Sequence, residues 1–169
     1  MADVLTLRPA TRDDLTAVDA LLARSYPRLL AADYPPSVLV TAVPLIARAR
    51  PELLVSGSYW IALDAGGRVV GAGGWTPAAP QPAALSDAGT GHVRHVVTDA
   101  GRVRQGIGRA LMARVMRQAQ EAGMRQLDCL STRTAVPFYA ALGFRVLGPV
   151  EVPLRPGIVF PAVRMVRSL

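Results

Sequence analysis

The sequence predicts an α/β protein in which helices flank a central mixed β-sheet. Segments with the alternation of β-strands and segments with the periodicity of amphipathic helices follow one another along the chain. The C-terminal half has the order strand, helix, strand, helix, strand, which favours partly parallel pairing. The 169 residues are 51% hydrophobic, which is enough to bury a core without disulfides. No segment has the composition of a linker, so we expect one domain over residues 1–169.

The N-terminal segment predicts a short strand followed by a helix. Residues 4–8 alternate as a strand does, and Thr11 with Asp14 three residues later is typical of a capping-box helix start, with Asp in place of Glu. Apolar residues then recur at helical spacing up to about Ser25. We expect the helix to end there, because Tyr26 is followed by Pro27, which would interrupt its hydrogen bonds.

Prolines and glycines divide the middle of the chain. Four prolines between residues 29 and 54 leave pieces too short for one long helix, and we expect a broken helix over residues 37–47. Residues 59–63 and 69–75 are β-rich and flank an Asp-Ala-Gly-Gly-Arg turn, which predicts a hairpin. The Pro/Ala/Gly-rich segment 77–91 is expected to form a loop.

The C-terminal half predicts alternating strands and helices, followed by a hairpin. They are a strand at 92–98, a helix ending at 122, a strand at 125–130, a helix at 135–142, and a hairpin that begins at 144–147 and returns near 158–166. Gly123 and Gly143 follow the two helices, at the position where glycine often ends a helix.

The charge balance narrows the possible chemistry. The net charge is +7, and all 19 basic residues are Arg, so a Walker-type phosphate loop and a Schiff-base lysine are excluded. A GC-rich genome would give the same preference for arginine. Nucleic-acid binding is a possible function of a basic protein, but it is not favoured here. The arginines are dispersed along the sequence, and only nine aromatic residues could stack on bases.

The single cysteine and the hydropathy pattern point to a cytoplasmic protein. Cys129 has no partner for an internal disulfide and cannot build a zinc site alone, so we expect a reducing compartment, no metal, and a core role for this thiol. No apolar stretch approaches the roughly 20 residues of a bilayer span. The N-terminal residues also lack the pattern of a signal peptide. We therefore expect no membrane association.

A strand, a glycine-containing loop and a helix follow one another at residues 92–122. Such a loop can bind phosphate, because the first N–H groups of a helix have no helical partner. Gly106 and Gly108 allow close approach, and Arg104 and Arg109 add positive charge. An ordinary turn between strand and helix remains an alternative. A dinucleotide-binding loop is less favoured, because the third glycine is missing.

Two motifs resemble those of the GNAT superfamily, the acetyl-CoA-dependent N-acetyltransferases. Residues 103–108, Val-Arg-Gln-Gly-Ile-Gly, are similar to the family's Arg/Gln-x-x-Gly-x-Gly/Ala loop. Residues 135–144, Ala-Val-Pro-Phe-Tyr-Ala-Ala-Leu-Gly-Phe, are similar to its Ala-x-x-Phe-Tyr-x-x-x-Gly-Phe segment. The resemblance implies a mostly antiparallel sheet, splayed where acetyl-CoA enters. It also implies transfer of an acetyl group from acetyl-CoA to a primary amine by direct attack, with a small-molecule or peptide acceptor. Homodimers are common in the family.

The resemblance also implies which residues hold acetyl-CoA. The pyrophosphate would bind the backbone of the glycine loop, and the pantetheine arm would pair with the preceding strand. The residues so implied are Val96, Val97, Thr98, Arg104, Gln105, Gly106, Ile107, Gly108, Arg109 and Thr132. Val103 departs from the usual Arg or Gln, Thr132 stands where many members have Asn, and Arg102 is placed to reach the remaining phosphate.

By the same resemblance, Tyr139 is the general acid that protonates the leaving thiolate, and the N–H near Val97 is the oxyanion donor. Packing in the core is the alternative role for Tyr139. His92 stands near the place of the family's Glu base, whereas His95 would face the other way unless a bulge intervenes.

Four large aromatic residues come from segments that line the acceptor pocket in the family, and core packing is equally compatible with them. They are Tyr26, Tyr34, Trp60 and Trp75. The alternative function is a GNAT-fold module that binds acetyl-CoA as a sensor or interaction partner with little catalysis.

Overall fold

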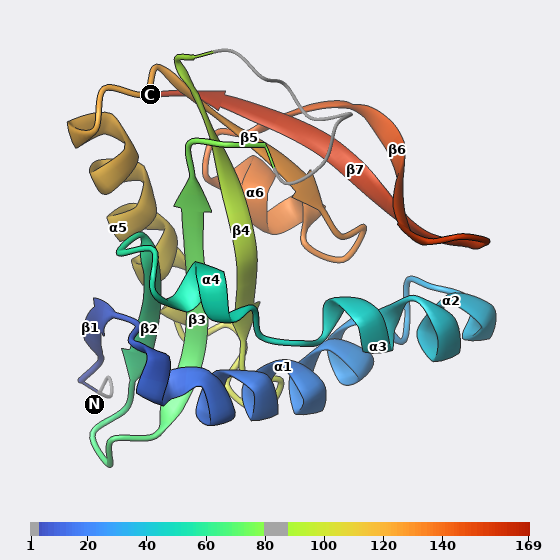
Figure 1. Ribbon diagram of the computed structural model, residues 1–169, viewed down its shortest axis with the longest axis horizontal. Helices are drawn as coiled ribbons and strands as arrows, with labels where there is room; N and C mark the ends of the chain where they lie inside the picture. The colour runs from blue at the N-terminus through green and yellow to red at the C-terminus, as the bar shows by residue number, and fades with distance from the viewer. Residues whose placement is uncertain (1–3, 80–87) are drawn as a thin grey trace.

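The computed structural model describes residues 4–79 and 88–169, and a seven-stranded mixed sheet forms its centre (Figure 1). The strand order is β1-β2-β3-β4-β5-β7-β6, and neighbours are antiparallel except for the parallel pair β4 and β5. The strands are β1 (Thr6–Pro9), β2 (Tyr59–Leu63), β3 (Val69–Thr76), β4 (Thr90–Thr98), β5 (Gln126–Ser131), β6 (Arg145–Arg155) and β7 (Ile158–Ser168). The predicted class and the partly parallel sheet are confirmed.

Helices cover both faces of the sheet. They are the 3₁₀ turn η1 (Arg12–Asp14), α1 (Leu15–Leu30), α2 (Pro36–Thr41), α3 (Val43–Ile46), α4 (Pro51–Leu54), α5 (Ile107–Glu121) and α6 (Val136–Ala141). The segment from α1 to α4 crosses one face, and α5 and α6 lie behind the sheet in Figure 1. Within the described ranges, no helix is both long and apolar enough to cross a bilayer.

The alternation of β2 separates two hydrophobic cores. Tyr59 and Ile61 face the core under α1, whereas Trp60 and Ala62 pack on the side of α5. This follows from the strand geometry, in which successive side chains point to opposite faces. Both faces of the sheet are therefore buried, and each carries its own layer of helices.

The strands β4 and β5 separate soon after they pair. Their parallel register covers only Thr90–His92 against Gln126–Asp128. Farther along, β4 stays paired with β3, and β5 stays paired with β7. The sheet is therefore open between its two central strands, as the resemblance implied.

The structure corrects the predicted end of the first helix. The prediction that α1 stops at Tyr26 and Pro27 is wrong, because α1 continues to Leu30. A proline inside a helix costs about 3 kcal/mol. Burial of Tyr26, which is 9% exposed, and of Leu30, which is 2% exposed, offsets this cost, since each large apolar side chain contributes roughly 1.5–3 kcal/mol.

Prolines open the next helices rather than prevent them. The broken helix predicted over 37–47 is observed as α2 and α3, and the short α4 was not predicted. Pro36, Pro44 and Pro51 each occupy the first turn of one of these helices. At that position the missing N–H has no helical partner to lose.

The predicted capping box at Thr11 and Asp14 is confirmed. The Thr11 N–H donates to the Asp14 carboxylate at 2.7 Å, and the Arg8 guanidinium binds the same carboxylate with two contacts of 2.8 Å. The hydrogen bonds from Arg8 lower the pKa of Asp14 despite its burial. The start of α1 is thereby tied to β1.

The loop predicted over 77–91 lies partly outside the described residues. The structure leaves residues 80–87 undescribed, and β4 begins at Thr90, two residues before the predicted start of this strand at 92. The hairpin of β2 and β3 and the hairpin of β6 and β7 are confirmed.

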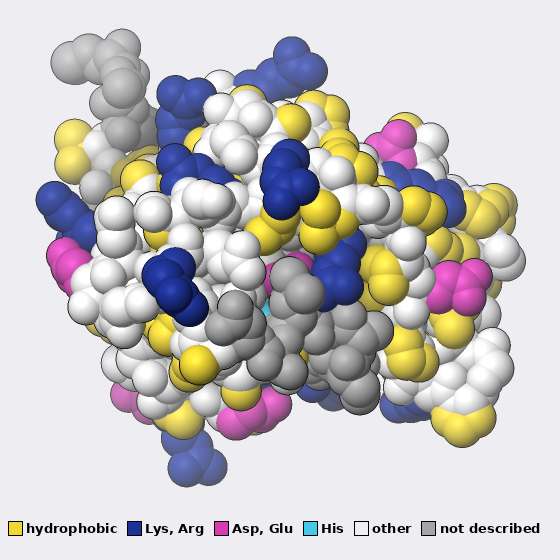
Figure 2. Space-filling view, turned by 90° about the horizontal axis from the view of Figure 1, so that it is seen from above, with side chains coloured by type: hydrophobic (Ala, Val, Ile, Leu, Met, Phe, Trp, Pro, Cys, Tyr) yellow, Lys and Arg dark blue, Asp and Glu magenta, His cyan; other side chains and the backbone are white. Residues whose placement is uncertain are grey.

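The arginine side chains bear on the question of nucleic-acid binding. On the face shown in Figure 2 they stand apart, with apolar and neutral side chains between them, and form no continuous basic stripe. A groove for nucleic acid would need such a stripe. This face therefore does not support the hypothesis of nucleic-acid binding.

Gly71 on β3 allows the start of α5 to pack against the sheet. A Cβ atom here would lie 2.6 Å from Cγ2 of Ile107 and 3.0 Å from Cδ1 of Leu111. We predict that Gly71→Ala lowers the free energy of unfolding by about 1–3 kcal/mol, measured by urea denaturation. The control is Gly66→Ala in the adjacent turn, where the nearest atom is 3.4 Å away; its effect should stay within about 0.5 kcal/mol. Equal effects of the two substitutions would contradict this packing argument.

Candidate active site

A cavity of about 310 Å³ lies where β4 and β5 separate. The two strands form its opposite sides, and α1 and the segment between α3 and α4 line it on one face of the sheet. On the other face it is lined by α6 and by Gly108 at the start of α5. The apolar side chains that β6 and β7 contribute belong to the core under α1. The cavity thus passes through the sheet and is open to groups from both faces.

A bulge in β4 shapes one wall of this cavity. Ala72 pairs with Val97 and Gly74 pairs with Arg94, so β4 has one more residue than β3 between these pairs. His95 has a φ of +47°, a left-handed conformation that is rare for a residue with a side chain. The bulge brings His95 to the cavity wall.

Two buried tyrosines hold the bulge from the side of α1. The Tyr59 hydroxyl donates to the carbonyl oxygen of His95 at 2.9 Å, and the Tyr26 hydroxyl donates to that of Val96 at 3.2 Å. Burial raises the pKa of Tyr26 and of Tyr59 well above the usual value, so both remain donors at neutral pH. The carbonyl groups of the bulge are therefore fixed in direction.

The loop after β4 presents backbone N–H groups at the start of α5. Arg104 and Gly106 have φ values of +62° and +80°, and the N–H of Ala110 donates to the carbonyl oxygen of Gly106 at 3.0 Å. Among the described residues, the N–H groups of residues 107–109 have no hydrogen-bond partner. Exposed N–H groups in a left-handed turn at a helix start bind anions.

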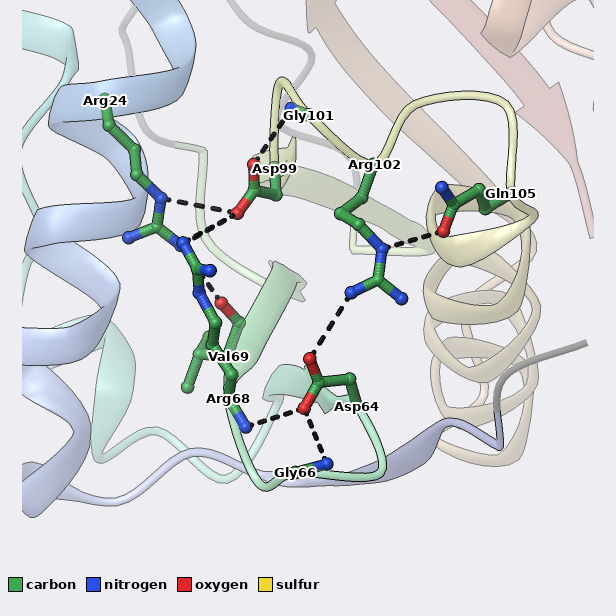
Figure 3. A network of polar contacts seen from close by, with 9 residues as sticks. All are labelled: Arg24, Asp64, Gly66, Arg68, Val69, Asp99, Gly101, Arg102 and Gln105. Carbon is green, nitrogen blue, oxygen red and sulfur yellow. Dashed lines mark hydrogen bonds and ion pairs between the residues drawn. The ribbon is translucent and has the colours of Figure 1, made fainter.

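Asp99 ties the beginning of this loop to α1 (Figure 3). Its carboxylate accepts from Nη2 of Arg24 at 3.0 Å and from the N–H of Gly101 at 2.9 Å, and Arg68 lies 3.6 Å away. Burial acts to raise the pKa of Asp99, but the N–H of Gly101 and the two guanidinium groups outweigh it and lower the pKa. The carboxylate is thus ionised and holds the loop in place.

Arg102 ties the middle of the loop to the turn between β2 and β3 (Figure 3). Its Nη1 lies 3.3 Å from the Asp64 carboxylate, and its Nε donates to the side-chain oxygen of Gln105 at 2.8 Å. Arg102 was predicted to reach a phosphate, and that role stays a prediction. Its observed contacts fix the loop.

Gly108 allows three elements to meet beside the cavity. A Cβ atom here would lie 3.1 Å from the ring of Phe138 on α6 and 3.4 Å from Oγ1 of Thr98 on β4. The Thr132 hydroxyl holds the turn before α6, because it accepts from the N–H of Ala135 at 3.1 Å. Both Gly108 and Thr132 line the cavity.

Tyr139 on α6 combines core packing with a place on the cavity wall. It is 5% exposed, and its ring centroid lies 5.1 Å from that of Phe138 and 5.3 Å from that of Phe144. Burial raises the pKa of Tyr139 well above its usual value, and the neighbouring Cys129 adds to this effect. The phenol is therefore protonated at neutral pH.

The two histidines have different surroundings. His92 is 1% exposed, its Nδ1 lies 3.4 Å from the Asp128 carboxylate, and it is not among the residues that line the cavity. His95 lines the cavity, and burial together with the charges of Arg50 and Arg94 lowers its pKa to about 4. His95 is therefore neutral at physiological pH.

Residues 56–146 match a family model described as Acetyltransferase (GNAT) domain, which is more than half of the chain. The chain belongs to the GNAT acetyltransferase family. The resemblance and the predicted class of acyltransferase are confirmed by this match. Among curated proteins, none matches the chain.

Several solved structures share this fold. A GCN5-related N-acetyltransferase of Rhodopseudomonas palustris has a TM-score of 0.79 at 20% identity, with 100% of this chain and 98% of that chain covered. The PaiA N-acetyltransferase of Thermoplasma acidophilum, solved in complex with coenzyme A, has a TM-score of 0.66 at 12% identity, with 98% and 99% covered. A Mycobacterium tuberculosis protein solved with CoA and NLQ has a TM-score of 0.63 at 20% identity, with 97% and 99% covered.

The residues that the resemblance implied for binding acetyl-CoA, together with Tyr139, fall into two groups. Val96, Val97, Thr98, Gly108, Thr132 and Tyr139 line the cavity. Arg104, Gln105, Gly106 and Arg109 are exposed at the start of α5, and the Ile107 side chain is buried against Ala62, Val70 and Leu111. Ile107 can therefore offer a ligand only its backbone N–H.

Sequence reasoning did not single out two cavity residues, Arg50 and Arg94. Arg50 precedes a helix of only four residues that was not predicted, and no motif contains Arg94. Of the four aromatic residues proposed for the pocket, only Tyr26 lines the described cavity. The indole N–H groups of Trp60 and Trp75 instead donate to the Gln118 side chain on α5, at 2.9 Å and 3.0 Å.

Cys129 is buried on β5 and lines the cavity. Burial raises the pKa of this thiol to about 12, so it carries no thiolate at neutral pH. The expected core role fits this state, because the thiolate rather than the thiol is the nucleophile.

Replacing Asp99 should loosen the loop. We predict that Asp99→Asn lowers the free energy of unfolding at pH 7 by about 1 kcal/mol, because the ion pair with Arg24 is partly exposed. Since folding lowers the pKa of Asp99, its contribution is present above the unfolded pKa of about 3.9 and is lost as the pH falls further. Urea denaturation over a series of pH values from about 7 to about 2 measures this difference. Asp13→Asn, at an exposed carboxylate, is the control, and a difference between Asp99→Asn and wild type that does not shrink as the pH falls below about 3.9 would contradict the assignment.

Proposed function

We propose that the protein transfers an acetyl group from acetyl-CoA to a primary amine. One observation carries this proposal. The cavity between β4 and β5 continues to a helix start whose N–H groups have no partner among the described residues. A thioester arm and a pyrophosphate need these two features side by side. Fold relatives that were solved with coenzyme A support the same assignment.

The residues present suit the two parts of acetyl-CoA. The N–H groups of residues 107–109, with Arg104 and Arg109 close in sequence, suit the pyrophosphate. Residues 96–98 of β4 face the gap that β5 leaves, and a pantetheine arm would bind there in the manner of a strand. Thr132, which lies in the turn before α6 at the cavity wall, would contact this arm.

The transfer requires an amine in its neutral form. The amine nitrogen attacks the thioester carbonyl carbon, a C–N bond forms, and the N–H near Val97 stabilises the oxyanion. The C–S bond then breaks, and the phenol of Tyr139 donates its proton to the leaving thiolate. Because burial raises its pKa, Tyr139 carries this proton at neutral pH. The phenolate that remains takes up a proton from water after the thiol has formed.

The proton released by the amine needs an acceptor. His92 was predicted as the base, but its ring is buried beside Asp128 and does not line the cavity, so it could act only through a relay. His95 lines the cavity, and we assign the proton relay to this residue. With a pKa of about 4, His95 holds the proton weakly and passes it on to water.

Tyr139→Phe tests the general acid. We predict that it lowers kcat by roughly 100-fold or more, because the thiolate then leaves unprotonated. The measurement is thiol release over a panel of amines, with affinity for coenzyme A followed by calorimetry. Tyr34→Phe is the control, since this phenol donates to the carbonyl of Pro161 at 2.7 Å and does not line the cavity. Unchanged turnover in Tyr139→Phe would make the acid assignment wrong.

The same measurements separate transfer from binding alone. A protein that binds acetyl-CoA by calorimetry but releases no thiol with any amine would be the sensor or interaction module of the alternative reading. Absence of binding would overturn both readings.

The pH dependence of kcat/KM distinguishes the two histidines. We predict that His95→Ala changes the acidic limb of the profile, whereas His92→Ala retains it, because only His95 lines the cavity. Retention of the acidic limb in His95→Ala and its loss in His92→Ala would restore the base role to His92.

A further inference from the structure

Two arginines and a histidine line the cavity near the bulge. Arg94 comes from β4 directly before His95, and Arg50 comes from the residue that precedes α4. The described lining includes no Asp or Glu, and the wall contributed by α1, α3, β6 and β7 is otherwise mainly apolar. Its residues include Leu29, Ile46, Val152, Leu154 and Phe160.

Arg94 has a hydrogen bond but no acidic partner in the described part of the chain. It is half-buried, and its Nη1 donates to the hydroxyl of Thr76 at 3.1 Å. No carboxylate among the described residues lies within 4.0 Å of its guanidinium or of that of Arg50. A cation that is partly removed from water without a counter-ion is costly unless a ligand supplies the anion.

The charges of Arg50 and Arg94 affect the same part of the cavity. Burial lowers the pKa of Arg94, and the positive charge of Arg50 lowers it further, although the charge of Glu52 opposes this. The charges of both arginines also lower the pKa of His95. This part of the cavity therefore has a positive potential that no carboxylate in the cavity lining neutralises.

The positive charges of Arg94 and Arg50 lie apart from the phosphate site that we expect at the start of α5. The N–H groups at the start of α5 follow Thr98 at the end of β4, whereas Arg94 precedes the bulge. Tyr59 and Arg94 both pair with Gly74, so their side chains lie on the same face of the sheet. Tyr59 packs in the core under α1, whereas α5 belongs to the core on the opposite face. Arg94 and Arg50 therefore face the acceptor rather than the nucleotide.

We infer that the acetyl acceptor is a small amino acid with an apolar side chain, and that Arg94, assisted by Arg50, binds its carboxylate. This inference rests on the proposed acetyl transfer and names its substrate class. A guanidinium binds a carboxylate through parallel hydrogen bonds of fixed geometry, which places the α-amine at a set distance from the anchor. The apolar wall accommodates the side chain, and a cavity of about 310 Å³ limits its size.

Paired acceptors test the anchor directly. Leucine, methionine and phenylalanine would each be compared with the corresponding amino acid amide, with thiol release from acetyl-CoA as the measurement. The amide has the less basic amine and is more often neutral, so without an anchor it should be the better acceptor. We expect kcat/KM to favour at least one of these free amino acids over its amide by roughly 10- to 100-fold, the range of a hydrogen bond to a charged group.

Substitutions assign the preference to residues. Arg94→Gln should raise KM for the preferred amino acid by roughly 10-fold or more while kcat changes little, and should abolish the preference over the amide. Arg94→Lys should restore part of it, and Arg50→Gln should have a smaller effect because Arg50 is exposed. Arg114→Gln removes the same charge from α5, where Arg114 lies 4.9 Å from the Trp60 ring centre, and should leave the preference unchanged.

The outcomes separate this inference from the proposed function. Thiol release that favours the amides in the wild type, or a preference that Arg94→Gln leaves intact, would overturn the carboxylate anchor and leave acetyl transfer standing. No thiol release with any amine would overturn the transfer itself and the anchor with it. Calorimetry with coenzyme A on each variant shows whether the cofactor site is intact, because Arg94→Gln should bind coenzyme A as the wild type does.

Discussion

The strands β4 and β5 pair over three residues at their beginnings and then separate, and the cavity exists because of this separation. Closing the gap with further parallel pairing would satisfy the backbone of both strands but would fill the space in which a ligand can bind. The outer partners make the open arrangement stable, since β3 holds β4 and β5 is paired with β7 over six residues. The backbone groups that face the gap can then be satisfied by an extended ligand, as an exposed strand edge is by an added strand.

Backbone strain is concentrated at two places along the same path. His95 and Arg104 are the non-glycine residues with positive φ among those described, and one lies at the bulge while the other lies in the loop before α5. Each such residue costs on the order of 1–3 kcal/mol. The tyrosine hydroxyl groups behind the bulge and the network of Asp99 and Arg102 around the loop hold these conformations. The strained positions and the polar groups that restrain them therefore lie along one segment, from the bulge in β4 to the start of α5.

Local signals in the sequence predicted most of the elements, and tertiary contacts decided the rest. The capping box of Thr11 and Asp14 and the hairpin turn after β2 depend on neighbouring residues, and both were predicted. The passage of α1 through Pro27 depends on burial against the sheet, which no local pattern reveals. The position of His95 depends on a bulge that only the register with β3 defines. That Arg50 and Arg94 line one cavity likewise depends on how the segment before α4 folds over the sheet.

The arginines of this chain differ in their partners, and this difference is more informative than the net charge of +7. Arg8, Arg24 and Arg102 each lie within hydrogen-bond distance of an aspartate and hold elements of the fold together. Arg50 and Arg94 line a cavity whose described walls carry no carboxylate. Folding brings structural arginines next to acids because an unpaired, partly buried cation is costly. An arginine left without an acid at a cavity therefore marks a place where a ligand would supply the opposite charge, and the fold confines that place to the side of the sheet away from the start of α5.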